Sequence, residues 1–269
     1  MMTGDKEFGR RAVSPIPLSR VLDKLDALTA KKDYAEAARF LEYWRGEARL
    51  AGDLRGEFTL LNEAMGVYRK AESREEAMEC AEKALALIES IGNEGTISAG
   101  TAYVNAGTVY QFCGETQKAL ACFRKAQEIY ERELPAQDKR LASLYNNMAL
   151  ALTAAGEYER AFACYQFALE GMEEQQYGEL EQAITYLNMA NAAEAVKGQE
   201  EAEEEIREYL DKAEALLMEK TLPRNSYYAF VCEKCFPTFS YYGWFRTAQD
   251  LKDAAESIYN KEICEGETV

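Results

Sequence analysis

The chain has 269 residues, of which 48% are hydrophobic, so it is long enough to bury a sizeable core in one large domain or two small ones. Its formal net charge of -16 disfavours binding to nucleic acid and to anionic membranes, because an acidic surface repels phosphate groups. The lack of histidine excludes Ser-His-Asp and Cys-His nucleophile systems and His-containing zinc sites within one chain.

Residues 1–14 are expected to form a flexible tail ahead of the first helix. They carry charges but no apolar core segment, which argues against a secretory signal. No run of about 18 apolar residues predicts a transmembrane helix. The seven cysteines are odd in number and scattered, which favours reduced thiols and a cytoplasmic location over a disulfide framework.

Apolar residues then recur at helical spacing, interrupted by short polar or glycine-containing turns. This pattern predicts helical pairs at about 15–50, 56–92, 98–134, 140–174 and 182–218. Three of the pairs contain a Tyr-x-Asn unit, beginning at Tyr103, Tyr145 and Tyr186, and the Asn spacings are 42 and 41 residues.

A column of small residues repeats with the same period. Ala77, Ala119 and Ala161 are 42 residues apart, and Phe123 and Tyr165 form an aromatic column nearby. Small residues let helices approach closely, and the aromatic rings fill the space between them. A lone helical pair cannot bury its apolar face, so successive pairs must stack on one another.

The chain resembles the tetratricopeptide-repeat (TPR) family, and most closely the long-period repeats of kinesin light chains. The resemblance is carried by Ala106-Gly107, Tyr110, Gly114, Ala119, Phe123 and Ala126, and again by Leu144 to Ala149, Gly156-Glu157-Tyr158, Ala161, Tyr165 and Ala168. It is strong over about residues 57–170 and looser over 18–45 and 184–218. It implies an all-α, right-handed superhelix of stacked pairs.

The fifth pair departs from the period. Between Gly198 and Leu216 the second helix is expected to start early and run long, with an insertion of about one turn. Its Glu200–Glu208 stretch is densely acidic, which is typical of a solvated helix face and also of a surface for a basic partner.

Residues 219–262 are expected to form a divergent, aromatic-rich helical pair that caps the array, followed by a tail at 263–269. Nine aromatic residues lie between Tyr227 and Phe245, and Pro237 is expected to kink or end a helix. Covering the exposed end of the core is the favoured role. A ligand pocket lined by some of these rings is the alternative.

The resemblance implies that the first helix of each pair lines the concave surface. Tyr and Asn of one Tyr-x-Asn unit point about 200° apart on a helix, so the tyrosines are expected to pack between helices while Asn105, Asn147 and Asn188 face the groove. In kinesin light chains and similar proteins, Asn in this column binds the backbone of an extended peptide. In the alternative interpretation, these amides bond neighbouring helices or water.

Further candidate groove residues share this face: Asn62, Arg69, Thr108, Gln111, Asn146 and Asn191, with Glu194 beside them. Arg69 and Lys70 are the main cations there and suit a carboxylate or a phosphate.

Cysteines occur in two patterns. Cys80, Cys122 and Cys164 share one column at 42-residue spacing, which favours packing over metal binding. Cys232 and Cys235 form a CxxC that nothing else completes, so two core thiols are favoured over a redox pair or half of a metal site. No catalytic residues, metal or cofactor are therefore predicted.

The leading hypothesis is an adaptor or scaffold that binds a protein or an extended peptide in its groove, with homo-oligomerisation left open. A second hypothesis is a peptide-responsive regulator whose output would come from another chain, because only about 15 residues precede the first helix. A third, disfavoured hypothesis is an enzyme that uses the aromatic C-terminal region.

Overall fold

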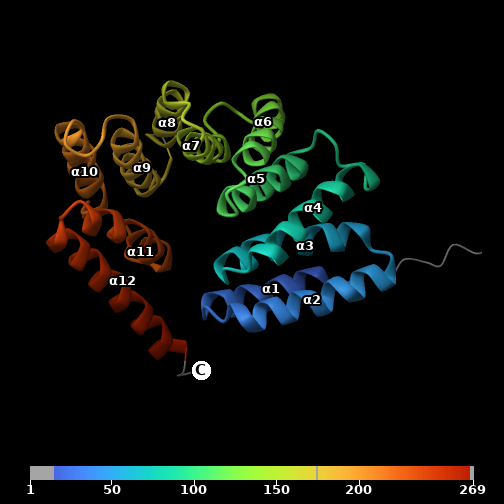
Figure 1. Ribbon diagram of the computed structural model, residues 1–269. Coiled ribbons are helices and arrows are strands. Elements are labelled where there is room, and N and C mark those ends of the chain that lie inside the picture. Colours follow the sequence, from blue (N-terminus) through green and yellow to red (C-terminus); the bar gives the residue numbers. More distant parts are fainter. Residues whose placement is uncertain (1–14, 174, 267–269) are drawn as a thin grey trace, which may run out of the picture. The chain divides into compact units, whose positions relative to one another are not determined.

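The computed structural model describes residues 15–173 and 175–266, with side chains as far as Asn260. Over these residues the chain forms twelve α-helices and no strands, which confirms the predicted all-α class (Figure 1). None of these helices is both long and apolar enough to span a membrane. The expected N-terminal tail, residues 1–14, lies outside the described residues.

The helices follow one another in pairs joined mostly by short turns. They are α1 (Leu18–Ala30) and α2 (Tyr34–Ala51), α3 (Leu54–Lys70) and α4 (Arg74–Ser90), α5 (Ile97–Phe112) and α6 (Thr116–Glu133), α7 (Lys139–Ala154) and α8 (Tyr158–Glu173), α9 (Glu179–Lys197) and α10 (Glu203–Leu217), and α11 (Ser226–Tyr241) and α12 (Phe245–Gly266).

The chain divides into two compact units, an N-terminal unit of Met1–Cys122 and a C-terminal unit of Phe123–Val269, with the boundary inside α6. In the N-terminal unit, α3 packs on α2, α4 and α5. In the C-terminal unit, α9 packs on its pair partner α10, on α8 and on the first helices α7 and α11. Within each unit, first helices therefore contact first helices of the next pair, as in stacked repeats.

Polar side chains cap several helix starts, where backbone N–H groups lack a helical partner. Asp33 accepts from the Glu36 N–H, and Thr96 accepts from the Ala99 N–H. Asp53 caps α3, because one of its carboxylate oxygens accepts from the N–H of Gly56 at 2.9 Å. The other oxygen accepts from the N–H of Ile16, in the segment before α1, at 3.1 Å. Asp53 thereby also ties the segment before α1 to the start of α3.

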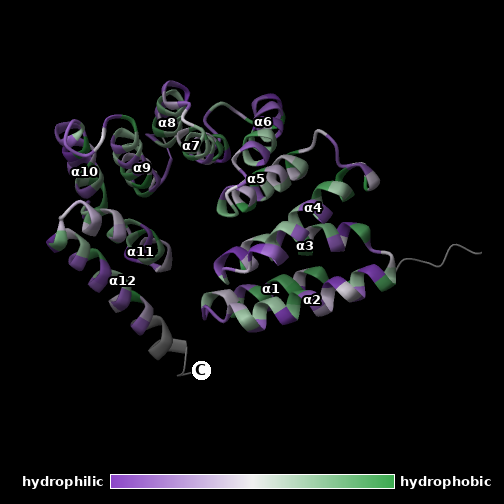
Figure 2. Ribbon diagram, in the orientation of Figure 1, coloured by the Kyte–Doolittle hydropathy of each residue, from purple (hydrophilic) through white to green (hydrophobic). Residues whose placement is uncertain are grey.

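The repeat columns form the core. Ala77, Ala119 and Ala161 are fully buried, as are the large rings of Phe123 and Tyr165, which confirms their predicted packing role. Green apolar and purple polar positions mix along the helices in Figure 2, as expected for helices with one buried face.

The expectation for the fifth pair is wrong in its detail. Helix α10 does not start early: it begins at Glu203 and has 15 residues. The additional length lies in α9, which has 19 residues, and in the turn 198–202 that follows it. Gly198 ends α9 with a φ of 78°, a left-handed value that residues with a Cβ rarely adopt.

Of the two effects expected of Pro237, a kink or a helix end, the helix end is wrong. Helix α11 continues through this proline to Tyr241. A proline removes its own N–H from the helical ladder and its ring crowds the preceding turn, and here the buried side chains of Cys235 and Phe239 hold the helix on either side of it. Helix α12 extends to Gly266, past the expected end at 262, and 267–269 of the expected tail lie outside the described residues.

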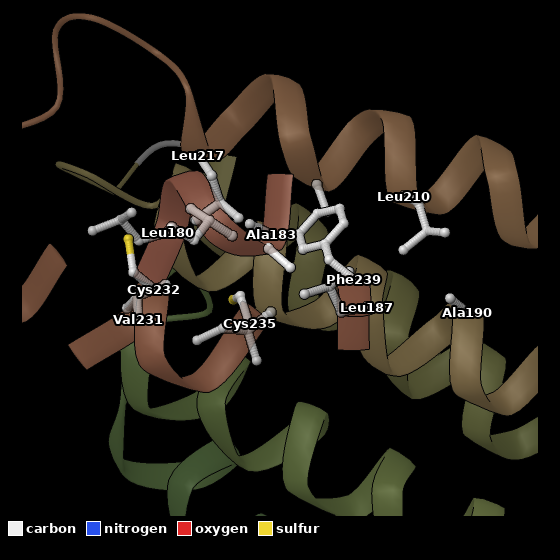
Figure 3. Packing of buried hydrophobic residues seen from close by; sticks show 14 of the residues in the cluster. Leu180, Ala183, Leu187, Ala190, Leu210, Leu217, Val231, Cys232, Cys235 and Phe239 are labelled. Atoms are coloured by element: carbon white, nitrogen blue, oxygen red, sulfur yellow. The ribbon is translucent and has the colours of Figure 1, made fainter. Parts of the chain in front are cut away.

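The pair is packed onto the end of the repeats by a continuous apolar cluster. Figure 3 shows Phe239, Val231, Cys232 and Cys235 of α11 against side chains of α9 and α10. The same cluster continues into α12 through Leu251 and Ala255. The α11–α12 pair thus covers apolar surface that α9 and α10 would otherwise expose.

Candidate functional site

Two pairs of asparagine side chains join neighbouring first helices. In the N-terminal unit, Asn105 Nδ2 on α5 donates to Asn62 Oδ1 on α3 at 3.2 Å. In the C-terminal unit, Asn188 Nδ2 on α9 donates to Asn146 Oδ1 on α7 at 3.1 Å. The partners are 43 and 42 residues apart, so the same contact recurs in two places along the chain.

Each pair leaves hydrogen-bonding capacity unused. A carboxamide has two N–H donors and an oxygen with two lone pairs. The bond uses one donor of Asn105 or Asn188 and one lone pair of its partner, while Asn62 Nδ2 also donates to the Phe58 carbonyl at 2.9 Å. Asn105 and Asn188 are half-buried, so their remaining donor and their Oδ1 stay within reach of a ligand.

This arrangement differs from a ladder of three equivalent residues. Asn147, predicted as the middle member, is half-buried on α7, and its side chain makes no hydrogen bond to the described residues. Asn146, its neighbour, is only 9% exposed and makes the bond to Asn188. Asn105 and Asn188 therefore each bond a neighbouring helix, which is the alternative interpretation of these amides. This contact leaves a role in peptide binding open.

Two of the three tyrosines of the Tyr-x-Asn units, Tyr145 and Tyr186, stack on aromatic rings of second helices. The ring of Tyr145 stacks on Phe167 of α8 at 5.2 Å between centroids, and its hydroxyl donates to Glu131 Oε1. Burial and then this glutamate raise the pKa of Tyr145 to about 12. Tyr186 stacks on Tyr209 of α10 at 6.2 Å. These rings therefore fix the orientation of α7 and α9 against the second helices α8 and α10.

The other candidates in the N-terminal unit lie near Asn105 or at the end of α3. Thr108 Oγ1 donates to the Asn105 carbonyl at 2.8 Å, so this hydroxyl serves its own helix. Gln111 is half-buried in the last turn of α5. Arg69 is exposed in the last turn of α3, where a cation suits the negative end of the helix dipole, and Lys70 lies 5.8 Å over the Tyr34 ring.

Asn191 and Glu194 are engaged by the C-terminal pair. The Tyr242 hydroxyl approaches Asn191 Oδ1 at 3.1 Å and Glu194 Oε2 at 2.7 Å, and the Tyr241 hydroxyl donates to Glu194 Oε1 at 2.8 Å. Tyr227 donates in the same way to Glu181 at the other end of α9. Nothing in the sequence pattern pairs these tyrosines with α9, because the contacts cross 46 to 51 residues outside the repeat period.

Most of the described cysteines are core residues, whereas Cys113 and Cys164 are half-buried. Cys80, Cys232 and Cys235 are free and buried, and burial raises the pKa of Cys80 and of Cys232 to about 11. Burial also raises the pKa of Cys235. A thiol held neutral is a poor nucleophile and a poor metal ligand. No group of three or more His, Cys, Asp or Glu side chains is placed to hold a metal ion anywhere in the described part of the chain.

Two family models, both described as tetratricopeptide repeat, match residues 57–132 and 141–174. Among solved structures, the fold is similar to a protein from Podosopora anserina described as a kinesin light chain with nearly identical TPR-like repeats. That match has a TM-score of 0.51 and 16% identity, and it covers 75% of this chain and 94% of that one. A second similar structure, BtubC (BKLC) from P. vanneervenii, has a TM-score of 0.51 and 18% identity and covers 91% of this chain and 92% of that one.

A sequence search of curated proteins finds no match. TPR repeats generally mediate protein interactions and are typically non-enzymatic scaffolds. The matched models, the stacked helical pairs and the similar solved folds agree with one another: residues 57–132 and 141–174 are tetratricopeptide repeats, and the fold is similar to that of a kinesin-light-chain-like repeat protein.

Proposed function

We propose that the chain is a binding scaffold that holds an extended peptide segment of another protein on the first helices within one of its two units. The observation that carries this proposal is the pair of amide contacts, Asn62–Asn105 and Asn146–Asn188. Each contact restrains two carboxamides against rotation, so a ligand that binds them loses less side-chain entropy.

The chemistry of the amides suits a peptide main chain. A peptide group offers one N–H donor and one carbonyl acceptor, and a carboxamide offers the complement of both. Such a contact does not depend on the ligand's side chains, so it supplies affinity. Selectivity comes from neighbouring polar groups, of which half-buried Gln111 and exposed Arg69 are available in the N-terminal unit.

The test starts from displayed random peptides selected on the wild-type protein. Selected peptides are labelled with fluorescein, and their Kd is measured by anisotropy against wild type, Asn105→Ala and Asn188→Ala. A net hydrogen bond contributes about 0.5–1.5 kcal/mol, so one lost bond should weaken binding by about two- to thirteen-fold. Asn260→Ala removes an exposed asparagine from α12 and serves as the matched control.

The result depends on which unit a peptide uses. A peptide bound by the N-terminal unit should respond to Asn105→Ala, and one bound by the C-terminal unit should respond to Asn188→Ala. If every selected peptide binds both variants as tightly as it binds the Asn260→Ala control, the amides are structural and the proposal fails.

A further inference from the structure

A cleft of about 300 Å³ lies in the C-terminal unit where the turn between α9 and α10 meets the turn between α11 and α12. Its lining residues come from both turns and from α10: Gln199, Glu200, Glu203, Ile206, Arg207, Leu210, Tyr242 and Trp244. It is separate from the Asn146–Asn188 contact described above, and none of its lining residues belongs to that contact.

One of the two turns that form the cleft departs from the repeat. The turn 198–202 spans five residues, whereas 155–157 joins α7 to α8 with three, and the longer turn supplies Gln199 and Glu200. The opposite wall is the turn Tyr242–Trp244, in which Gly243 has a φ of 81°.

The aromatic wall is held in place from behind. Trp244 packs on the buried ring of Phe239 with 5.8 Å between ring centroids. The Tyr242 hydroxyl is hydrogen-bonded to Glu194 on α9. Both rings are half-buried, so each presents part of its surface to the cleft.

The rest of the lining combines apolar and acidic groups. Ile206 and Leu210 are buried and form an aliphatic floor. Glu200 and Glu203 are exposed at the rim. Arg207 is the sole cation among the lining residues, and its guanidinium lies 3.6 Å from the Glu203 carboxylate.

The acidic character continues outside the cleft. Glu204, Glu208 and Asp211 line an adjoining shallow surface of α10 together with Glu203 and Arg207. Lys212 pairs with Glu208 at 2.6 Å, which leaves this surface with a net negative charge. A positively charged segment would therefore be attracted to this surface as a whole.

We propose that this cleft binds an arginine side chain of a partner protein. A guanidinium is planar, so it stacks on an indole face while its edge donates to a carboxylate. Trp244 supplies the face, Glu200 and Glu203 supply carboxylates, and the aliphatic floor receives the arginine's methylene stem. The volume of about 300 Å³ is at the lower limit for ligand pockets and suits one side chain better than a cofactor.

Arg207 determines the sign of one test. Its guanidinium already neutralises part of the Glu203 charge and repels a second cation. Replacing Arg207 with glutamine should therefore tighten binding of an arginine ligand. The same change would weaken binding if the cleft instead received an anion.

Trp244 provides the signal, because the chain has 2 tryptophans and Trp44→Phe leaves Trp244 as the sole one. In this background the protein is titrated at about 0.15 M salt with the capped peptide Gly-Arg-Arg-Gly. The peptides Gly-Lys-Lys-Gly and Gly-Glu-Glu-Gly serve as comparisons. We expect a saturable change in Trp244 emission with the arginine peptide, at an affinity about three-fold or more above that for the lysine peptide.

Variants then assign the contacts. Glu200→Gln combined with Glu203→Gln should weaken binding of the arginine peptide by about ten-fold, the loss expected for charge-assisted hydrogen bonds. Arg207→Gln should strengthen it. Glu204→Gln, which removes a carboxylate beside the cleft but outside its lining, is the matched control and should change binding by less than about two-fold at this ionic strength.

Three outcomes would overturn the proposal. These are no saturable response to the arginine peptide, equal affinity for the lysine peptide, and binding of the glutamate peptide that Arg207→Gln weakens. Asn188→Ala should leave the affinity for the arginine peptide unchanged, so failure here is distinguishable from failure of the scaffold proposal.

Discussion

Truncation of Phe239 tests whether the C-terminal pair is part of the stabilising core. Its side chain is fully buried in the cluster that joins α9, α10, α11 and α12 (Figure 3). Replacing a buried Phe with Ala typically costs about 3–5 kcal/mol, because both the transfer free energy and the packing around the cavity are lost. The ring contact with Trp244 adds to this cost, by about 0.5–1.5 kcal/mol in comparable aromatic pairs.

Urea unfolding of single-tryptophan proteins measures the effect. Trp244 lies in the C-terminal unit and Trp44 in the N-terminal unit, so each reports on a different unit. With the ring contact included, the loss is about 3.5–6.5 kcal/mol, so an m value of about 2 kcal/mol per M predicts that Phe239→Ala lowers the midpoint seen by Trp244 by about 1.8–3.3 M. The Trp44 signal, followed in a Trp244→Phe background, shows whether the N-terminal unit unfolds in the same step.

Phe239→Leu keeps the experiment informative if the alanine variant does not fold. Leucine retains most of the buried apolar area, so this substitution should cost about 1–2 kcal/mol and leave a cooperative transition. A midpoint unchanged by both substitutions would refute the assignment of α11 and α12 as a cover for the repeat core.

Three further changes have defined expectations. Gly171→Ala on α8 places a Cβ 2.9 Å from Ala142 Cβ, so an overpacking cost of about 1–3 kcal/mol should outweigh a helix-propensity gain of about 1 kcal/mol. A melting temperature above that of wild type would contradict this. A double-mutant cycle with Ala142→Gly should show that the two positions are coupled. Asp53→Ala removes the acceptors for the N–H groups of Gly56 and Ile16 and should lower stability by about 1–2 kcal/mol in urea unfolding, whereas a loss below about 0.5 kcal/mol would show that water replaces both bonds. Burial raises the pKa of Cys232 from 9.0 to about 11, so the stability that the neutral thiol contributes is fully present below pH 9 and is lost as pH rises towards 11. The difference in unfolding free energy between pH 7.5 and pH 10.5 should therefore be smaller in Cys232→Ala than in wild type. An unchanged difference would assign the alkaline loss of stability to other groups.

The helical pairs could be predicted because the small and aromatic residues that indicate them recur with a fixed spacing. A 42-residue spacing of Ala77, Ala119 and Ala161 requires the same packing environment at each position, and all three are fully buried. The aromatic column of Phe123 and Tyr165 is determined in the same way. Repeats make each column an independent measurement of one structural requirement.

The amide pairs could not be read from the same columns. Asn105 and Asn188 lie in one repeat column, but their partners Asn62 and Asn146 lie in the column one residue earlier. Adjacent columns point about 100° apart around a helix, so a first helix meets its preceding and its following neighbour with different columns. Sequence spacing defines which residues are equivalent, whereas contact depends on which side of the helix each column faces.

The departures from the repeat carry the most specific chemistry. A residue in a strict column, such as Ala161, is constrained by stacking on both sides and is unavailable for selective binding. The longer turn after α9 escapes that constraint, and together with the turn before α12 it brings Glu200 and Trp244 into one cleft. The turn 198–202 interrupts the period without breaking the apolar cluster beneath it, in which Leu210 and Phe239 stay buried. The sequence can therefore change at such interruptions while the periodic positions maintain the solenoid. The period predicts the architecture for this reason, and the interruptions indicate where to look for a ligand site.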